Sequence, residues 1–382
     1  MKTISNKKIF IIVPELKFFL SHRLQLVRGL AQQGWNFVIV TSHDIEPEDE
    51  LGIRYEIFDT HRKRFSFINL IHNGLRLIKL VQSENPNLIY AVSHRAIFLA
   101  RLANLFVRKK SIYAISGMGS LFSSKVDLKK SLKNSILQIV VTYIYKYLIR
   151  SQNSNFLLQN KDDLEFLIKL NITNSSRAFK IEGNGIEDSQ FSNEQAPISS
   201  TKFVMISRLL RDKGVLEFLQ AAKNILNKGN NRNCEFILYG DIDDANFNSL
   251  TLSDIQPYLS SSIIYAGYSS DIQACIKNAS VVVLPSYREG FSKVLMEAQA
   301  NARPVITSNV TGCKDTILSG STGFLVEAMN ANDLQEKIEF FISNPALVVN
   351  MGKAAYEHAV KNFSIQKAID EHIEMFSTIL SD

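Results

Sequence analysis

Short apolar runs alternate with amphipathic stretches along most of the chain, and this feature restricts the possible folds most strongly. The runs are rich in β-branched residues and lack the polar alternation of half-exposed strands, so both faces of each strand are expected to be buried. Strands of this kind, joined by helices, form right-handed βαβ units in a parallel sheet. In the second half of the chain the runs are FVMIS (203–207), EFILYG (235–240), SIIYAG (262–267), VVVLPS (281–286) and PVITS (304–308).

The first half repeats the pattern, and a helical stretch, SHRLQLVRGLAQQG, ends at Gly34. We therefore predict an α/β protein with two Rossmann-like, doubly wound parallel-sheet domains that face a crevice, with ligands at the carboxyl ends of the strands. Residues 184–201 are polar and predict a linker. The expected domains are 1–195 and 196–362. The apolar runs of the first half are KIFIIVP (8–14), WNFVIVTS (35–42), NLIYAVS (87–93) and KSIYAIS (110–116).

Charge is distributed unevenly over the 382 residues, whose net charge is +6. Residues 1–195 carry 27 Lys and Arg against 17 Asp and Glu, whereas residues 196–382 carry 16 against 20. A basic first half suits a polyanion, an anionic membrane or a phosphorylated substrate, and drift in surface composition is the alternative. The three cysteines are scattered, which argues against a disulfide framework or a zinc site. No run is long and apolar enough for a membrane-spanning helix.

Residues 131–150 stand apart from this pattern, because nearly everything between regularly spaced polar residues is apolar. As a helix, the segment has one narrow polar stripe, so it is either buried or laid into a lipid interface. Four lysines before or within it, at 125, 129, 130 and 133, suit anionic headgroups. The polar positions are Asn134, Gln138, Thr142, Lys146 and Arg150.

The most informative stretch, residues 285–315, places two carboxylates eight positions apart. Glu289 lies at a strand-to-helix turn, and Glu297 is expected two helical turns later on the same face, so that both address one ligand. The backbone of Gly290, Phe291 and Ser292 opens the helix and favours an anion there. A glutamate that merely complements the helix dipole is the alternative interpretation.

Two cations follow the first strand of the second half, Arg208 and Lys213 in ISRLLRDKGV. At a strand carboxyl end they are suited to hold a diphosphate and to stabilise it as it leaves, since Arg offers a bidentate fork and Lys a point charge.

The sequence blocks around Arg208 and around Glu289, together with two further blocks of the second half, resemble in order the motifs of the retaining GT-B glycosyltransferases of family 4 (group 1). The resemblance covers most of residues 181–365. The first half is similar to the subgroup that builds surface glycans on polyprenyl diphosphate, through FFLSHRLQLVRGLAQQGW (18–35), LARLAN (99–104), AISGMGSLF (114–122) and GNGIED (183–188). The blocks of the second half are SRLLRDKGVLEFLQAAK, IIYAGYSSDI, LPSYREGFSKVLMEAQANARPVITSNVTGCKD and GSTGFLVE.

The resemblance implies a role for each residue of the second half. Arg208 and Lys213 would bind the donor diphosphate and act as an electrophilic clamp in place of a metal, Glu297 would bond the ribose hydroxyls, and Glu289 with the Gly290–Phe291 backbone would hold the donor sugar. Transfer would proceed with retention, and the leaving diphosphate would help to accept the proton of the acceptor. A helix over 363–382 would pack back on the first domain.

A metal site is the alternative at Asp241-Ile242-Asp243, a DxD spacing. We favour acidic residues that line the nucleotide region, with Asp241 on the donor side, so no metal and no other cofactor is expected. On the acceptor side the candidates are in the first half, where histidines and glycines follow predicted strands. They are His22, Arg23, His94, Gly117 and Gly119.

The resulting prediction is a retaining transferase that moves a hexose or N-acetylhexosamine from a UDP-sugar to a polyprenyl-diphosphate-linked saccharide. It would lie in the cytoplasm, in peripheral contact with the anionic inner face of the membrane. A UDP-sugar 2-epimerase of the same architecture and a non-catalytic glycan- or membrane-binding scaffold are the alternatives. An NAD site would need GxGxxG after a strand, and nucleic-acid binding would need an aromatic and basic platform; neither pattern is present.

Overall fold

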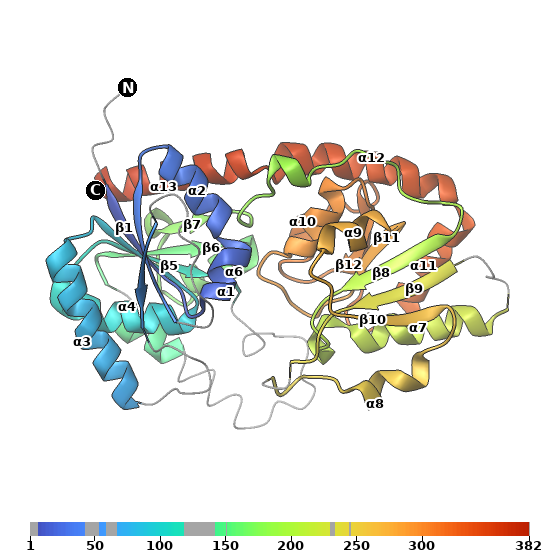
Figure 1. Cartoon of the computed structure of the whole chain (residues 1–382), viewed down its shortest axis with the longest axis horizontal. Coiled ribbons are helices and arrows are strands. Elements are labelled where there is room, and N and C mark those ends of the chain that lie inside the picture. Colours follow the sequence, from blue (N-terminus) through green and yellow to red (C-terminus); the bar gives the residue numbers. More distant parts are fainter. Residues whose placement is uncertain are drawn as a thin grey trace. The chain divides into compact units, whose positions relative to one another are not determined.

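The computed structural model describes residues 7–42, 53–58, 67–117, 142–149, 151–229, 234–243 and 246–381. The chain divides into two compact units (Figure 1): unit 1 comprises 1–185 and 365–382, and unit 2 comprises 186–364. The division therefore falls at residue 185, whereas the sequence placed it at 195. Each unit is built on one parallel sheet, which confirms the predicted pair of Rossmann-like domains.

The sheet of unit 1 has seven parallel strands in the order β3-β2-β1-β4-β5-β6-β7. Successive residues of β1 point to opposite faces, and both faces are buried: Ile9 and Ile11 join one apolar core, while Phe10 and Ile12 join the other. This explains why the strands show no polar alternation. The strands are β1 (Lys8–Ile12), β2 (Asn36–Thr41), β3 (Arg54–Ile57), β4 (Leu88–Val92), β5 (Ser111–Ile115), β6 (Ser154–Leu158) and β7 (Ala178–Lys180).

Helices cover the two faces of this sheet. They are α1 (Leu16–His22), α2 (Leu24–Gln32), α3 (Phe67–Glu84), α4 (His94–Val107), α6 (Lys161–Lys169) and α13 (Ile365–Ser381). The helix predicted over 363–382 is α13, and it belongs to unit 1. It packs on the same core as α2, where the rings of Trp35 and Phe376 meet edge to face at 5.2 Å between centroids.

Residues 131–141 and 150 of the predicted stripe helix lie outside the described residues. The described end is a π-helix, Ile144–Ile149. Tyr145 and Ile149 are buried, whereas Tyr143 and Tyr147 are exposed. The exposed side of this end therefore includes two tyrosine rings, and the contact of the segment with a lipid interface stays a prediction.

The sheet of unit 2 has six parallel strands in the order β10-β9-β8-β11-β12-β13. The strands are β8 (Thr201–Ile206), β9 (Cys234–Tyr239), β10 (Ile263–Gly267), β11 (Val281–Leu284), β12 (Val305–Ser308) and β13 (Gly323–Val326). The helices are α7 (Val215–Asn227), α8 (Leu252–Ile255), α9 (Ile272–Lys277), α10 (Lys293–Ala300), α11 (Ala331–Ser343) and α12 (Pro345–Asn362). The strands are added to one side of β8 first and then, from β11 on, to its other side, so the strand order reverses between the parallel strands β8 and β11. The carboxyl ends of these two strands, at this reversal point, are the expected place for a ligand.

Candidate functional site

The loops after β8 and β11 are fastened to each other at this reversal point. The backbone N–H of Tyr287 donates to the carbonyl of Asp212 at 2.8 Å, and the Ser286 hydroxyl donates to the same carbonyl at 3.1 Å. Gly214 has φ +77°, and a Cβ there would lie 2.2 Å from the Pro285 carbonyl oxygen. Only glycine fits such a position, so the sequence DKG sets the approach of the two loops.

Lys213 and Glu289 form an ion pair between these loops. The Lys213 Nζ lies 2.6 Å from Glu289 Oε1, and the side chains are 20% and 14% exposed. The sequence predicted both as site residues from separate motifs 76 positions apart, and the structure brings them together at the reversal point. A partly buried lysine with a carboxylate on one side keeps further N–H groups for an anionic ligand.

A third loop, which follows β12, holds the backbone of Glu289. The Glu289 N–H donates to the Thr311 carbonyl at 3.1 Å, and a Cβ on Gly312 would lie 2.2 Å from the Glu289 carbonyl oxygen. The Glu289 N–H is therefore occupied, and the group that this residue can offer to a ligand is its carboxylate.

Arg208 pairs with the loop after β9. Its Nη1 lies 2.6 Å from Asp243 Oδ2, and its side chain is 52% exposed. The Leu209 N–H donates to the Asp241 carbonyl at 2.9 Å, which ties the two loops together. A half-exposed guanidinium in an ion pair exchanges partners readily, because such pairs are worth little in water.

Glu297 lies on α10 and is buried, with its Oε1 3.3 Å from Lys293 Nζ. Burial raises the pKa of its carboxyl group, and Lys293 offsets only part of that effect. The expectation that Glu289 and Glu297 share one helical face is wrong, because α10 begins at Lys293 and Glu289 precedes it. The eight-residue spacing therefore says nothing about their relative direction.

The segment before α10 offers its backbone rather than its side chains. Ser292 is the N-cap of α10. Phe291 is buried, and its ring meets that of Phe363 at 5.8 Å between centroids. Because the Phe291 side chain belongs to a small apolar core, only the main chain of Gly290 and Phe291 can meet a ligand.

Asp241 and Asp243 of the DxD sequence have partners within the protein. Asp243 pairs with Arg208, and Asp241 Oδ1 accepts from the backbone N–H of Ile242 at 2.9 Å. Within the described ranges, no three His, Cys, Asp or Glu side chains are grouped so as to hold a metal ion. Independence of a metal remains a prediction.

The acceptor-side candidates belong to unit 1. His22 is exposed, and its Nδ1 lies 2.6 Å from the Ser21 hydroxyl. Arg23 is buried against Tyr90. The His94 ring bonds the Tyr145 hydroxyl, and desolvation lowers the pKa of His94. Gly117 follows β5 with φ +142°, and Gly119 lies outside the described residues.

Two family models match the chain, one over each unit. The model described as "Glycosyl transferase 4-like" matches residues 8–160, and the model described as "Glycosyl transferases group 1" matches residues 187–358. The chain belongs to the group 1 glycosyltransferases. The family predicted from the sequence motifs is thereby confirmed.

Curated relatives of similar length carry related names. The chain is 27% identical to the capsular polysaccharide biosynthesis glycosyltransferase CapM of Staphylococcus aureus, over 99% of this chain and 98% of the relative. It is 24% identical to the N,N'-diacetylbacillosaminyl-diphospho-undecaprenol alpha-1,3-N-acetylgalactosaminyltransferase of Campylobacter jejuni, over 90% and 93%. It is also 24% identical to the UDP-Gal:alpha-D-GlcNAc-diphosphoundecaprenol alpha-1,3-galactosyltransferase of Escherichia coli, over 85% and 84%.

Solved structures share the GT-B fold of this glycosyltransferase. A sucrose-phosphate synthase from Thermosynechococcus elongatus matches with a TM-score of 0.82 at 17% identity, over 98% of this chain and 99% of the other. HepE of Anabaena, in complex with UDP and glucose, matches with a TM-score of 0.76 at 16% identity, over 97% and 99%. At these identities the likeness concerns the fold.

Three features of the site were missed in the sequence. Asp243 was interpreted as part of a metal motif or of an acidic loop that lines the nucleotide region, yet it is the partner of Arg208. Tyr287 donates to Glu217 Oε1 at 2.7 Å and so fastens the β11 loop to α7. Thr311 and Gly312 hold Glu289 from the β12 loop. The one available signal was the glycine in TGCKD after a predicted strand.

Proposed function

We propose that the chain transfers a sugar, a hexose or N-acetylhexosamine, from a UDP-sugar to a saccharide carried on polyprenyl diphosphate, with retention at the anomeric carbon. The observation that carries this proposal is the Lys213–Glu289 pair at the reversal point of unit 2. It combines a cation for a diphosphate with a carboxylate for sugar hydroxyls in a partly dry setting, where both act more strongly than in water.

In this proposal the donor diphosphate binds Lys213 Nζ and the Arg208 guanidinium, and Arg208 gives up part of its contact with Asp243. The Glu289 carboxylate accepts hydrogen bonds from the donor sugar, and Glu297 accepts them from the ribose. The relatives named for UDP-Gal and for undecaprenyl-linked substrates support these substrate classes.

The chemical step breaks the bond between the anomeric carbon and the diphosphate oxygen, and it forms a bond from that carbon to the acceptor oxygen on the same face. The acceptor proton passes to the departing phosphate oxygen. Lys213 and Arg208 stabilise the negative charge that develops on the diphosphate, which is the role that a divalent ion has in other transferases.

Donor binding is tested first, by thermal shift with UDP-, GDP-, ADP- and dTDP-sugars in EDTA, since a ligand of the native state raises its apparent stability. We expect a shift with one UDP-sugar. The Lys213→Ala variant should lose the shift, whereas Lys228→Ala, which breaks an exposed 2.6 Å pair with Glu339, should keep it. Equal shifts in both variants would contradict the assignment of Lys213.

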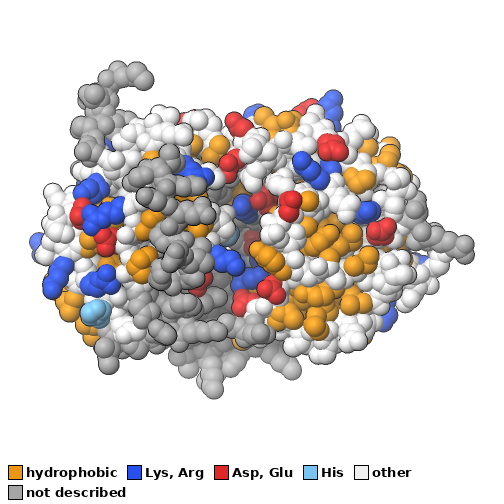
Figure 2. All heavy atoms as spheres, in the orientation of Figure 1, with side chains coloured by type: hydrophobic (Ala, Val, Ile, Leu, Met, Phe, Trp, Pro, Cys, Tyr) orange, Lys and Arg blue, Asp and Glu red, His pale blue; other side chains and the backbone are white. Residues whose placement is uncertain are grey.

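We also propose that unit 1 contacts an anionic membrane surface. On α3, Ile71 and Leu75 are exposed, and Arg76 and Lys79 lie beside them; Figure 2 shows Lys and Arg side chains on the face of unit 1 that carries α3. Among the helices of the described ranges, none is long and apolar enough to span a bilayer. A surface contact of this kind combines apolar burial with attraction to lipid headgroups.

Flotation with vesicles tests this contact. Wild-type protein should float with vesicles that contain anionic lipid, and less with zwitterionic ones. Exchange of Ile71 and Leu75 for Ser should reduce flotation without lowering the melting temperature, because both side chains are exposed. Unchanged flotation of that folded variant would contradict the role of α3.

A further inference from the structure

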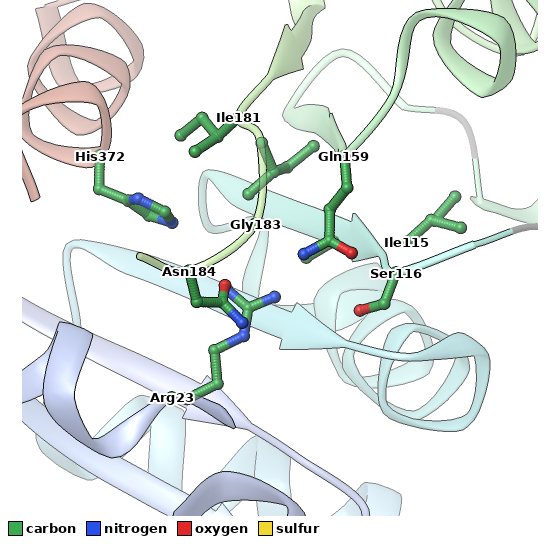
Figure 3. Close-up of a pocket in the computed structure, with 10 residues that line it drawn as sticks. Arg23, Ile115, Ser116, Gln159, Ile181, Gly183, Asn184 and His372 are labelled. Atoms are coloured by element: carbon green, nitrogen blue, oxygen red, sulfur yellow. The ribbon is translucent and has the colours of Figure 1, made fainter. Parts of the chain in front are cut away.

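A narrow pocket in unit 1 lies at the carboxyl ends of its strands (Figure 3). Ser116 directly follows β5, Gln159 directly follows β6, and Asn184 comes shortly after β7. Arg23 reaches the pocket from the junction of α1 and α2, and His372 reaches it from α13. The pocket therefore occupies the edge of the sheet at which parallel α/β domains bind their ligands.

Arg23 brings an uncompensated charge into this pocket. It is 3% exposed, and its one hydrogen bond runs from Nη1 to the Tyr90 hydroxyl at 2.7 Å. Its Nε has no partner. Among the described residues, no carboxylate lies within ion-pair distance of the guanidinium. An arginine remains charged in proteins, and burial of an unpaired charge is costly; a bound anion would remove that cost.

Tyr90 and His372 form a hydrogen-bond chain that ends at the guanidinium and does not neutralise it. The His372 Nδ1 donates to the Ala368 carbonyl at 2.7 Å. In the neutral ring the Nε2 then accepts from the Tyr90 hydroxyl at 3.2 Å, and the Tyr90 oxygen accepts from Arg23. This order of donors requires a neutral imidazole. Burial, together with the Arg23 charge, lowers the pKa of His372 to about 3, so the net positive charge stays on Arg23.

Three polar side chains converge on the same space. In Figure 3 the ends of Asn184, Gln159 and Ser116 point toward the Arg23 guanidinium. None of these three side chains has a hydrogen-bond partner among the residues that the structure describes. Buried or half-buried amides and hydroxyls normally have hydrogen-bond partners. Because these three side chains have none within the described part of the chain, their donor groups are available to a ligand. Together they surround the cation with neutral hydrogen-bond donors and add no negative charge.

We propose that this pocket binds a phosphoryl group of the lipid-linked acceptor, with Arg23 as the cationic ligand and Ser116, Gln159 and Asn184 as hydrogen-bond donors. The inference rests on the proposed function, which supplies an acceptor with a diphosphate. A guanidinium matches the oxygens of a phosphoryl group through two parallel N–H bonds. The pocket would position the acceptor, and it takes no part in breaking the donor bond.

Calorimetric titration with inorganic pyrophosphate tests the site directly on the full chain. The titration is made in the Arg208→Ala/Lys213→Ala background, which removes both donor-side cations. We expect binding there and roughly 10- to 100-fold weaker binding after Arg23→Gln, because a charged hydrogen bond is lost. Arg54→Gln, an exposed arginine of the same unit, is the control and should bind as before. Equal affinity in the Arg23→Gln protein, or no binding by the folded parent, would overturn the proposal.

Two additional variants guard against a purely structural effect. Gln159→Ala leaves the Arg23–Tyr90–His372 chain intact and should still weaken pyrophosphate binding. Arg23→Lys keeps the charge but lacks the fork, so it should bind between wild type and Arg23→Gln. Normal binding by the folded Gln159→Ala protein together with full loss in Arg23→Lys would mean that Arg23 acts by supporting the fold, and the site would be rejected.

Kinetics distinguish the lipid-linked source from free phosphate. With a short-chain polyprenyl-diphosphate saccharide, Arg23→Gln should raise the KM for the acceptor and leave the affinity for UDP unchanged. An unchanged acceptor KM despite lost pyrophosphate binding would assign the pocket to free phosphate and overturn the acceptor role. If the wild-type chain transfers no sugar, the proposed function fails, and the pyrophosphate titration still decides whether an anion site exists.

Discussion

Replacement of Lys213 by Ala separates a catalytic role from a structural one. The change leaves the Glu289 carboxylate, 14% exposed, without its cation at 2.6 Å. Exposed pairs are worth about 0–1 kcal/mol, and breaking a buried pair costs about 3–5 kcal/mol. A pair that is 20% and 14% exposed lies between these limits, so we expect a loss of about 2 kcal/mol in the free energy of unfolding.

The effect on turnover should be larger than the effect on stability. A preorganised charge that meets the leaving group contributes roughly 100- to 1,000-fold to kcat. The assay compares kcat for sugar transfer and the denaturation midpoint in Lys213→Ala, in Lys213→Ala/Glu289→Gln and in the control Lys228→Ala. The Lys228–Glu339 pair has the same 2.6 Å distance but is 54% and 30% exposed.

The double variant measures how much of the stability loss comes from the unpaired Glu289 carboxylate. Glu289→Gln removes the unpaired carboxylate, so the double variant should regain stability relative to Lys213→Ala while kcat stays low. If Lys213→Ala retains kcat within about threefold of wild type, the diphosphate clamp is refuted, because the loss expected of a charge that stabilises the transition state is far larger. A return of kcat together with stability in the double variant would show that the Lys213–Glu289 pair only supports the fold, which would contradict the proposed roles of both side chains.

Three further perturbations follow from the same geometry. Burial raises the pKa of Glu297, so the contribution of this carboxyl group to stability is present at low pH and is lost as pH rises through the raised pKa. The Glu297→Gln variant should therefore melt at a higher temperature at neutral pH and bind the donor more weakly. A lower melting temperature would contradict this reasoning. His372 has a pKa lowered to about 3, so the free energy of unfolding should fall by up to about 1.4 kcal/mol per pH unit as pH drops below the pKa of histidine in the unfolded chain. Denaturation measured at several pH values between 4 and 7 should show a weaker dependence of this free energy on pH in the His372→Asn variant. Gly312→Ala should lower the free energy of unfolding by more than the about 1 kcal/mol expected from backbone strain alone, and it should reduce donor affinity, because its Cβ would lie 2.2 Å from the Glu289 carbonyl oxygen. Gly320→Ala is the matched control, since Gly320 has a similar φ and open space around it. Equal losses of stability in the two variants would exclude the steric argument.

The fold was predictable because both sheets consist of strands buried on both faces, which leaves unbroken apolar runs in the sequence. Strands β3, β6, β7 and β13 were not recognised, since they are short or carry polar residues, and tertiary pairing decides their conformation. The contact between Lys213 and Glu289 depends on the loops that follow two neighbouring strands, β8 and β11. The sequence motifs predicted both residues as site residues. Their contact follows from the strand order, which places β8 beside β11.

The least predictable part of the site was the state of individual side chains. His22 and Arg23 are neighbours in one motif, yet His22 is exposed and Arg23 is buried in unit 1. The turn between α1 and α2 determines this difference, and no periodic pattern reports it. The prediction that Glu289 and Glu297 share one helical face was wrong for a related reason, because it required a helix that begins before Lys293.

The most direct test of the central claim is to incubate the chain with a UDP-sugar and a short-chain polyprenyl-diphosphate saccharide in EDTA and to follow the anomeric proton by NMR. The account predicts a new glycosidic bond with the anomeric configuration of the donor. A product of inverted configuration, transfer that requires an added divalent metal, or epimerisation of the UDP-sugar without transfer would contradict it.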